Sequence, residues 1–86
     1  PTRYFLEVVR SGSIRVASAR LNVVPSALSR QIQNLETELG VPLFERRPRG
    51  MALTAAGEVY ARYAQAVALE SERMRSDLEE LRGLRR

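Results

Sequence analysis

A regular apolar stripe runs through the stretch "PSALSRQIQNLETELG", which covers residues 25–40. Its members are four, three and four residues apart, the spacing that places side chains on one face of an α-helix. They are Leu28, Ile32, Leu35 and Leu39. Pro25 suits the first helical turn, where its missing N–H costs nothing, and Gly40 suits the end of the helix. The sequence therefore predicts a helix over residues 25–39 with one face buried.

The opposite side of this helix is polar and carries no acid in its first half. At about 100° per residue, the side chains that project there are Ser26, Ser29, Arg30, Gln33 and Thr37. A shorter helix is predicted before it, capped by Ser13 and ending in a tight turn that suits Asn22. Two helices joined this way are typical of a helix-turn-helix, whose second helix enters the DNA major groove. An ordinary amphipathic helix with a solvated outer face is the alternative.

Two short apolar segments flank three arginines in "PLFERRPRGMALT", residues 42–54. The arginines are Arg46, Arg47 and Arg49. Pro48 and Gly50 mark a turn, so a two-stranded β-hairpin with a basic tip is predicted. A lone hairpin is marginal in water, and we expect Phe44 and Leu53 to anchor it on the helices. Behind a helix-turn-helix such a hairpin is a wing, whose arginines can reach phosphates or a narrow, A·T-rich minor groove.

A long final helix is predicted from its cap, Thr54, to near Gly83. At 1.5 Å per residue it extends roughly 40 Å, too far for a small domain to cover. Side chains with an a/d heptad rhythm run along it, and all except Ser71 are apolar or aromatic. The predicted dimer seam consists of Tyr60, Ala64, Val67, Met74, Leu78 and Leu81. A surface helix packed on its own domain and a solvated connector are the alternatives.

The net charge of +4 is unevenly distributed along the 86 residues. Residues 1–55 hold eight arginines against four glutamates, which gives +4, and residues 56–86 hold six arginines against six acids, which gives zero. No acid lies between Glu7 and Glu36, but four arginines do. An acid-free stretch of this length favours a polyanion as the partner.

The composition argues against an enzyme. The chain contains no His, Cys or Lys, so acid–base or nucleophilic work would fall to carboxylates, Tyr or Ser. Neither a paired-carboxylate motif nor a metal-ligand cluster stands out, and no catalytic residue, metal or cofactor is predicted. The longest apolar runs are a few residues, so no membrane span is predicted.

These residues carry a resemblance to a known family. The stretch "ALSRQIQNLETELGVPLFER" followed by "LTAAGE" resembles the N-terminal winged helix-turn-helix of LysR-type transcriptional regulators. The expected fold is all-α: three helices with a two-stranded hairpin wing in residues 1–54, then a long linker and dimerisation helix in residues 55–86. The resemblance implies a bacterial, cytoplasmic transcription factor that binds double-stranded DNA as a homodimer, with a tetramer as the alternative for the full-length protein.

The resemblance also places the DNA contacts. The family's base-contacting positions fall on Pro25, Ser26, Ser29 and Arg30, and Gln33 extends this set along the same helix. In the wing, Arg49 is expected in the minor groove and Arg47 on phosphate, while Arg46 is expected to pair within the protein, for example with Glu38. Many members have Gln then Pro where this chain has Pro25 then Ser26, and proline has no side-chain donor for adenine.

The sequence begins without Met, which suggests a piece of a longer chain. The resemblance implies a few further N-terminal residues and a larger C-terminal domain that binds a small-molecule effector. The alternative function is a helical protein–protein interaction module that uses the final helix as a zipper and binds no DNA. Such a zipper needs neither an acid-free surface nor an arginine-tipped hairpin, so DNA binding is the favoured interpretation.

Overall fold

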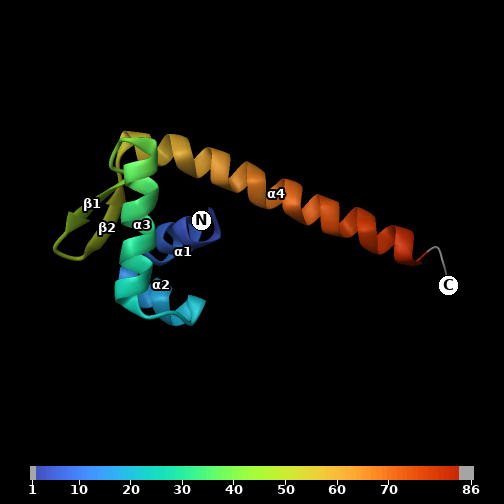
Figure 1. Ribbon diagram of the computed structural model, residues 1–86, viewed down its shortest axis with the longest axis horizontal. Helices are drawn as coiled ribbons and strands as arrows, with labels where there is room; N and C mark the ends of the chain where they lie inside the picture. The colour runs from blue at the N-terminus through green and yellow to red at the C-terminus, as the bar shows by residue number, and fades with distance from the viewer. Residues whose placement is uncertain (1, 84–86) are drawn as a thin grey trace.

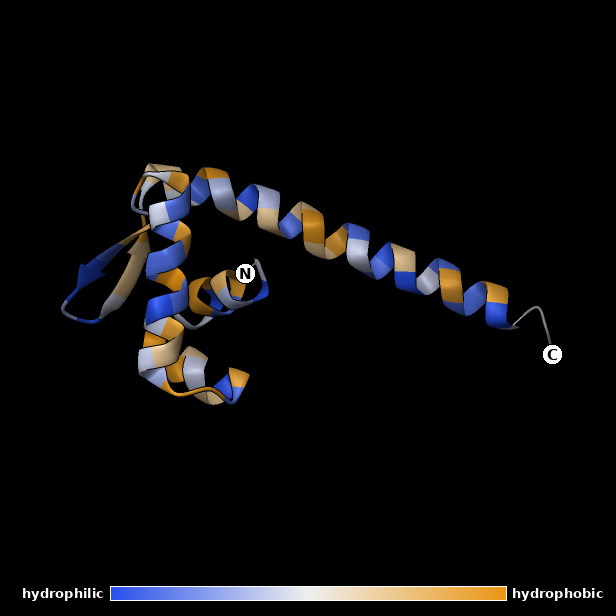
Figure 2. Cartoon of the chain, in the orientation of Figure 1, coloured by the Kyte–Doolittle hydropathy of each residue, from blue (hydrophilic) through white to orange (hydrophobic). Residues whose placement is uncertain are grey.

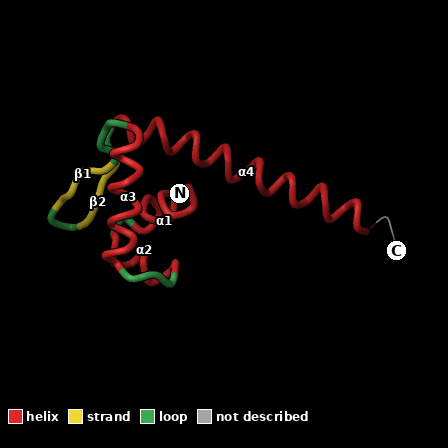
Figure 3. The backbone as a smooth tube through the Cα atoms, viewed as in Figure 1, coloured by secondary structure: helices red, strands yellow, loops and turns green. Residues whose placement is uncertain are grey.

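The computed structural model describes residues 2–83 and consists of a compact head from which one long helix extends (Figure 1). In chain order the elements are α1 (Thr2–Ser11), α2 (Ile14–Leu21), α3 (Pro25–Leu39), β1 (Phe44–Arg47), β2 (Gly50–Leu53) and α4 (Ala55–Gly83). The hairpin lies beside α3, and α4 leaves the head on the other side (Figure 3). The molecule is 54 Å along its longest axis. The predicted winged arrangement of three helices, a hairpin and a long helix is confirmed.

The helix ends lie where the sequence predicted them, and the capping residues explain why. The Ser13 hydroxyl accepts a hydrogen bond from the Val16 N–H at 3.3 Å, and the Thr54 hydroxyl accepts one from the Gly57 N–H at 2.9 Å. Asn22 ends α2 and Gly40 ends α3, both in the left-handed conformation, with φ of 61° and 74°. These two residue types adopt that conformation most readily.

The core lies where α1, α3, β1 and the start of α4 meet. Phe5 is fully buried, with its ring centroid 5.2 Å from that of Phe44 and 4.8 Å from that of Tyr60, the latter edge-to-face. Aromatic pairs in such geometry contribute about 0.5–1.5 kcal/mol beyond area burial. Burial raises the pKa of the Tyr60 hydroxyl, and the nearby Tyr63 and Glu38 raise it further. The first turns of α4 therefore share the core of the head.

Backbone contacts at three glycines fix the hairpin against the helices. The Met51 N–H donates to the Gly12 carbonyl oxygen at 3.0 Å. Gly50, with φ of 133°, passes so close that a Cβ there would overlap the same oxygen. At the base of the hairpin, a Cβ on Gly57 would overlap the Leu43 carbonyl oxygen. The wing therefore has a fixed position relative to the turn between α1 and α2.

One member of the predicted stripe departs from expectation. Leu28, Ile32 and Leu35 are buried, but Leu39 is exposed. The last turn of α3 extends past the packed core, and Leu39 lines an open hollow with Tyr60 and Tyr63. The prediction that the stripe is covered to its end was wrong at this residue.

Apolar residues recur along the length of α4 (Figure 2), and Leu69, Met74, Leu78 and Leu81 are exposed there. Beyond Ala64, no residue of α4 in the described part of the chain is fully buried. Within residues 2–83, no helix is both long and apolar enough to cross a membrane.

Candidate nucleic-acid interface

The outward face of α3 brings the predicted recognition residues together. Pro25 and Ser26 are exposed in the first turn, Arg30 and Gln33 are exposed further along, and Ser29 is half-buried. Within residues 2–83, the Arg30 side chain forms no ion pair with a carboxylate. Its guanidinium is therefore available to an external acceptor.

The first acid after the basic stretch, Glu36, is held by the backbone of the hairpin. Glu36 is half-buried, and its carboxylate accepts the backbone N–H of Leu43 at 2.7 Å and that of Phe44 at 3.2 Å. It attaches the start of the hairpin to α3. Because Glu36 lies in the C-terminal half of α3 and is occupied by these two donors, the exposed N-terminal half of α3 keeps its positive character.

The wing presents its arginines in different directions. In the hairpin, Arg46 is opposite Met51 and Arg47 is opposite Gly50. Arg46 lines a small hollow with Ser29 and Gln33, so the structure brings it beside α3. Arg49 lies in the turn and is exposed. The recognition helix and the wing thus form one continuous surface.

The expected pairing of Arg46 with Glu38 was wrong. Glu36 faces the hairpin, and Glu38, two residues on and about 200° around the helix, lies on the side of Tyr60. Arg47 instead pairs with Glu45 at 3.1 Å, with the two side chains 60% and 55% exposed. They can meet because residues two apart on a strand share a face. A surface pair of this kind contributes about 0–1 kcal/mol, so it offers little resistance to a phosphate that competes for Arg47.

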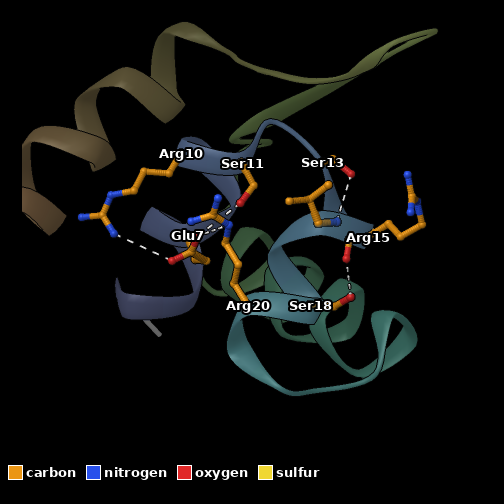
Figure 4. A network of polar contacts seen from close by, with 8 residues as sticks. Glu7, Arg10, Ser11, Ser13, Arg15, Ser18 and Arg20 are labelled. Atoms are coloured by element: carbon orange, nitrogen blue, oxygen red, sulfur yellow. Dashed lines mark hydrogen bonds and ion pairs between the residues drawn. The ribbon is translucent and has the colours of Figure 1, made fainter.

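The remaining acid of the head, Glu7, forms ion pairs with two arginines on the side of α1 and α2 (Figure 4). Its carboxylate lies 3.8 Å from Arg10 and 3.9 Å from Arg20, and it accepts a hydrogen bond from the Ser11 hydroxyl at 3.1 Å. Arg15, also on α2, is exposed and has no ion pair within residues 2–83. Reasoning from the sequence did not single out Arg15, or the position of Arg46 beside α3. The exposed face of α2 is a signal for the first.

The predicted dimer seam divides into two parts. Ala64 has no exposed surface, and Tyr60 packs edge-on against Phe5, so this end of the series lies in the protomer's own core. Val67 is half-buried. By contrast, Met74, Leu78 and Leu81 are 48%, 53% and 55% exposed. Among the predicted seam residues, the apolar surface left for a partner therefore lies in the distal half of α4.

The described residues hold no cluster of His, Cys, Asp or Glu side chains that could bind a metal ion. What they do show is a short helix, a tight turn and a second helix with an acid-free outer face, flanked by an arginine-rich hairpin. This arrangement defines the chain as a winged helix-turn-helix protein.

Comparison with known proteins gives the family. The sequence model of the bacterial regulatory helix-turn-helix proteins of the lysR family matches residues 2–58, more than half of the chain. The HTH-type transcriptional regulator ClcR of Pseudomonas putida is 45% identical over 76 residues, which are 86% of this chain and 26% of that regulator. YofA of Bacillus subtilis is 46% identical over 65 residues, 76% of this chain and 23% of the relative.

Solved structures lead to the same family. A crystal structure of BenM_DBD with catB site 1 DNA superposes with a TM-score of 0.87 at 38% identity, covering 93% of this chain and 90% of that one. A CbnR_DBD–DNA complex gives a TM-score of 0.83 at 35% identity, covering 99% and 94%. The chain belongs to the lysR family of bacterial regulatory helix-turn-helix proteins, as its sequence motifs predicted. It spans about a quarter of the length of ClcR.

Proposed function

We propose that this chain binds double-stranded DNA, with α3 in the major groove and the hairpin over the adjacent minor groove. The observation that carries the proposal is the charge of the α3 surface. Its exposed N-terminal half has no acid, its arginine has no ion pair within residues 2–83, and the carboxylate of the nearby Glu36 accepts two backbone N–H groups of the hairpin. The similarity to BenM_DBD and CbnR_DBD, both crystallised with DNA, supports this assignment.

Each side chain on α3 has a role that follows from its chemistry. Arg30 can donate two parallel hydrogen bonds to the O6 and N7 atoms of guanine, the commonest specific contact in the major groove. Ser26, Ser29 and Gln33 can donate to and accept from base edges or phosphates. Pro25 has no donor and contributes only an apolar surface.

The wing supplies contacts of a second kind. Arg49, at the exposed turn, is assigned to the minor groove, where a narrow A·T-rich tract concentrates negative potential. Arg47 is assigned to a phosphate in place of Glu45. These contacts orient the protein on the duplex and make affinity depend on salt concentration.

We infer that the distal half of α4 forms a dimer seam through Met74, Leu78 and Leu81. These side chains occupy one side of the helix and remain about half exposed within residues 2–83. A dimer places two copies of α3 on one duplex, which matches a two-part operator. A longer protein of this kind would act as a bacterial transcription factor in the cytoplasm, as a dimer or tetramer, with its effector bound by a further domain.

The decisive experiment compares two arginine variants on two duplexes. The cognate duplex is first selected from a random pool with the wild-type chain, and a shuffled duplex of the same composition is the non-specific competitor. Arg30→Ala should lose affinity for the selected duplex by about 1–3 kcal/mol more than for the shuffled one, because a bidentate contact to guanine discriminates by that amount.

Arg82→Ala is the matched control. It removes the same charge near the far end of α4, where Arg82 pairs with Glu79 at 3.1 Å, and it should affect both duplexes little and equally. If Arg30→Ala loses the same affinity for both duplexes, Arg30 contacts a phosphate and not a base edge. A wild-type chain that prefers no duplex in the pool would refute sequence-specific binding.

A further inference from the structure

Val24 is an exposed apolar residue at the start of the recognition helix. Its side chain is 61% exposed, although it lies directly between the buried part of the turn and the first turn of α3. Pro25 and Ala27 beside it are also exposed. Together these three residues form a small apolar edge on an otherwise polar surface.

Val24 does not serve the stability of its own helix. It occupies the N-cap position of α3 and makes no side-chain cap hydrogen bond. Ser, Thr, Asn and Asp are preferred at this position because a side-chain oxygen accepts a free N–H of the first turn, which valine cannot do. Since most of the side chain is in solvent, it also gains little from burial. Nothing within the protomer accounts for a valine here.

The backbone at Val24 has a defined conformation. The Val24 backbone is extended, with φ of −75° and ψ of 147°, as the following proline requires. Its carbonyl oxygen accepts the N–H groups of Ala27 and Leu28, both at 3.1 Å. A branched Cβ also restricts rotation about χ1. The Cα–Cβ bond of Val24 is therefore fixed at the tip of α3, and its two methyl groups have few directions in which to point.

In a helix-turn-helix, the N-terminal residues of the recognition helix contact base edges. The apolar group that a base edge offers in the major groove is the 5-methyl group of thymine. We propose that Val24, supported by Pro25, reads a thymine methyl group in each half-site, and so specifies a T·A pair that Pro25 cannot specify by hydrogen bonding. This inference rests on the proposed DNA binding.

Replacing thymine by deoxyuracil tests the contact directly, because uracil keeps every hydrogen-bonding group of thymine and lacks only the methyl. On the duplex selected with the wild-type chain, each thymine of a half-site is replaced in turn. We expect one position at which the wild-type chain loses about fourfold in affinity per half-site, the factor for removing one buried methyl group. Val24→Ala should bind the thymine and deoxyuracil duplexes equally at that position.

Three further variants separate recognition from folding. Val24→Ser should raise the melting temperature by supplying a cap, yet lose the dependence on the methyl group. Val24→Thr keeps one methyl and should retain part of that dependence. Val41→Ala changes another exposed valine, just beyond the opposite end of α3, and should keep all of it.

The outcomes distinguish this inference from the function on which it rests. If the wild-type chain binds its selected duplex but responds to deoxyuracil just as Val24→Ala does at every position, the methyl contact is refuted and DNA binding stands. If the wild-type chain selects no duplex, both fail together.

Discussion

Helices α3 and α4 both carry apolar residues at helical spacing, but they differ in how many of these residues are buried. The 15 residues of α3 bury Leu28, Ile32 and Leu35, whereas the 29 residues of α4 bury only Gly57 and Ala64. The two helices differ in how far other elements cover them. One face of α3 packs against α1, α2 and the hairpin, whereas all residues of α4 from Glu72 to Gly83 are exposed.

The exposed faces of the two helices also differ in charge. The outward face of α3 has no acid before Glu36. Along α4, by contrast, arginines pair with acids three residues away, Arg73 with Glu70 at 3.6 Å and Arg82 with Glu79 at 3.1 Å. A neutral, apolar-striped helix suits a second protein chain, while an unneutralised basic helix suits a polyanion. We therefore expect DNA to bind the head and a second copy of the chain to pack against α4.

The largest effect is expected from Phe5→Ala. Removing this fully buried ring should lower the free energy of unfolding by about 3–5 kcal/mol, a large share of the stability of a small domain. Leu78→Ala, which removes an exposed side chain in the protomer, should change the unfolding of a monomer by less than about 0.5 kcal/mol. Urea denaturation at low protein concentration measures both, and similar losses would mean that head and helix form one cooperative core.

The second largest effect is expected at the proposed dimer seam on α4. Met74→Arg combined with Leu78→Arg should weaken dimerisation by about 100-fold, because charges buried in an apolar interface cost several kcal/mol. Sedimentation should show monomer where the wild-type chain is a dimer, with a lower DNA affinity because one half-site is lost. The melting of the head should not change.

Gln65→Arg combined with Ser76→Arg is the control for this variant. Both residues are exposed, and at about 100° per residue both lie on the side of α4 opposite Met74 and Leu78. This pair adds the same charge outside the seam and should leave the dimer intact. A wild-type chain that remains monomeric at high micromolar concentration would contradict the seam in this chain.

The smallest effects are expected in the wing. Arg47→Ala should reduce the slope of log K against log[salt] by about 0.9 per lost phosphate contact and weaken binding to all sequences alike. Arg49→Ala should weaken binding most where the flanking sequence is A·T-rich, since the narrow groove there attracts an inserted arginine. Titration of both variants on two duplexes that differ only in that flank separates these roles. Equal losses for Arg49→Ala on both flanks would reduce the wing to an electrostatic clamp.

The sequence predicted the fold well because the decisive signals are local. Ser13, Asn22, Gly40 and Thr54 end or begin helices through contacts within a few residues of themselves. The family resemblance was confirmed for the same reason, since its motif is a continuous stretch. The assignment of individual DNA contacts and of the seam remains a prediction.

Features that depend on packing between distant segments could not be predicted. Whether Leu39 and Ala64 are covered depends on where the core ends, which periodicity does not reveal. The contact of Glu36 with the hairpin depends on backbone N–H groups seven and eight residues away. The exposure of Val24 likewise emerges only once the turn is folded.

Chemical-shift mapping of the backbone amides during titration with the selected duplex tests most directly whether DNA binds the head and not the distal helix. We expect the largest perturbations on residues 24–33 and 46–50, with residues 70–82 of α4 unperturbed. Perturbations concentrated along the distal half of α4, with α3 and the hairpin unchanged, would contradict it.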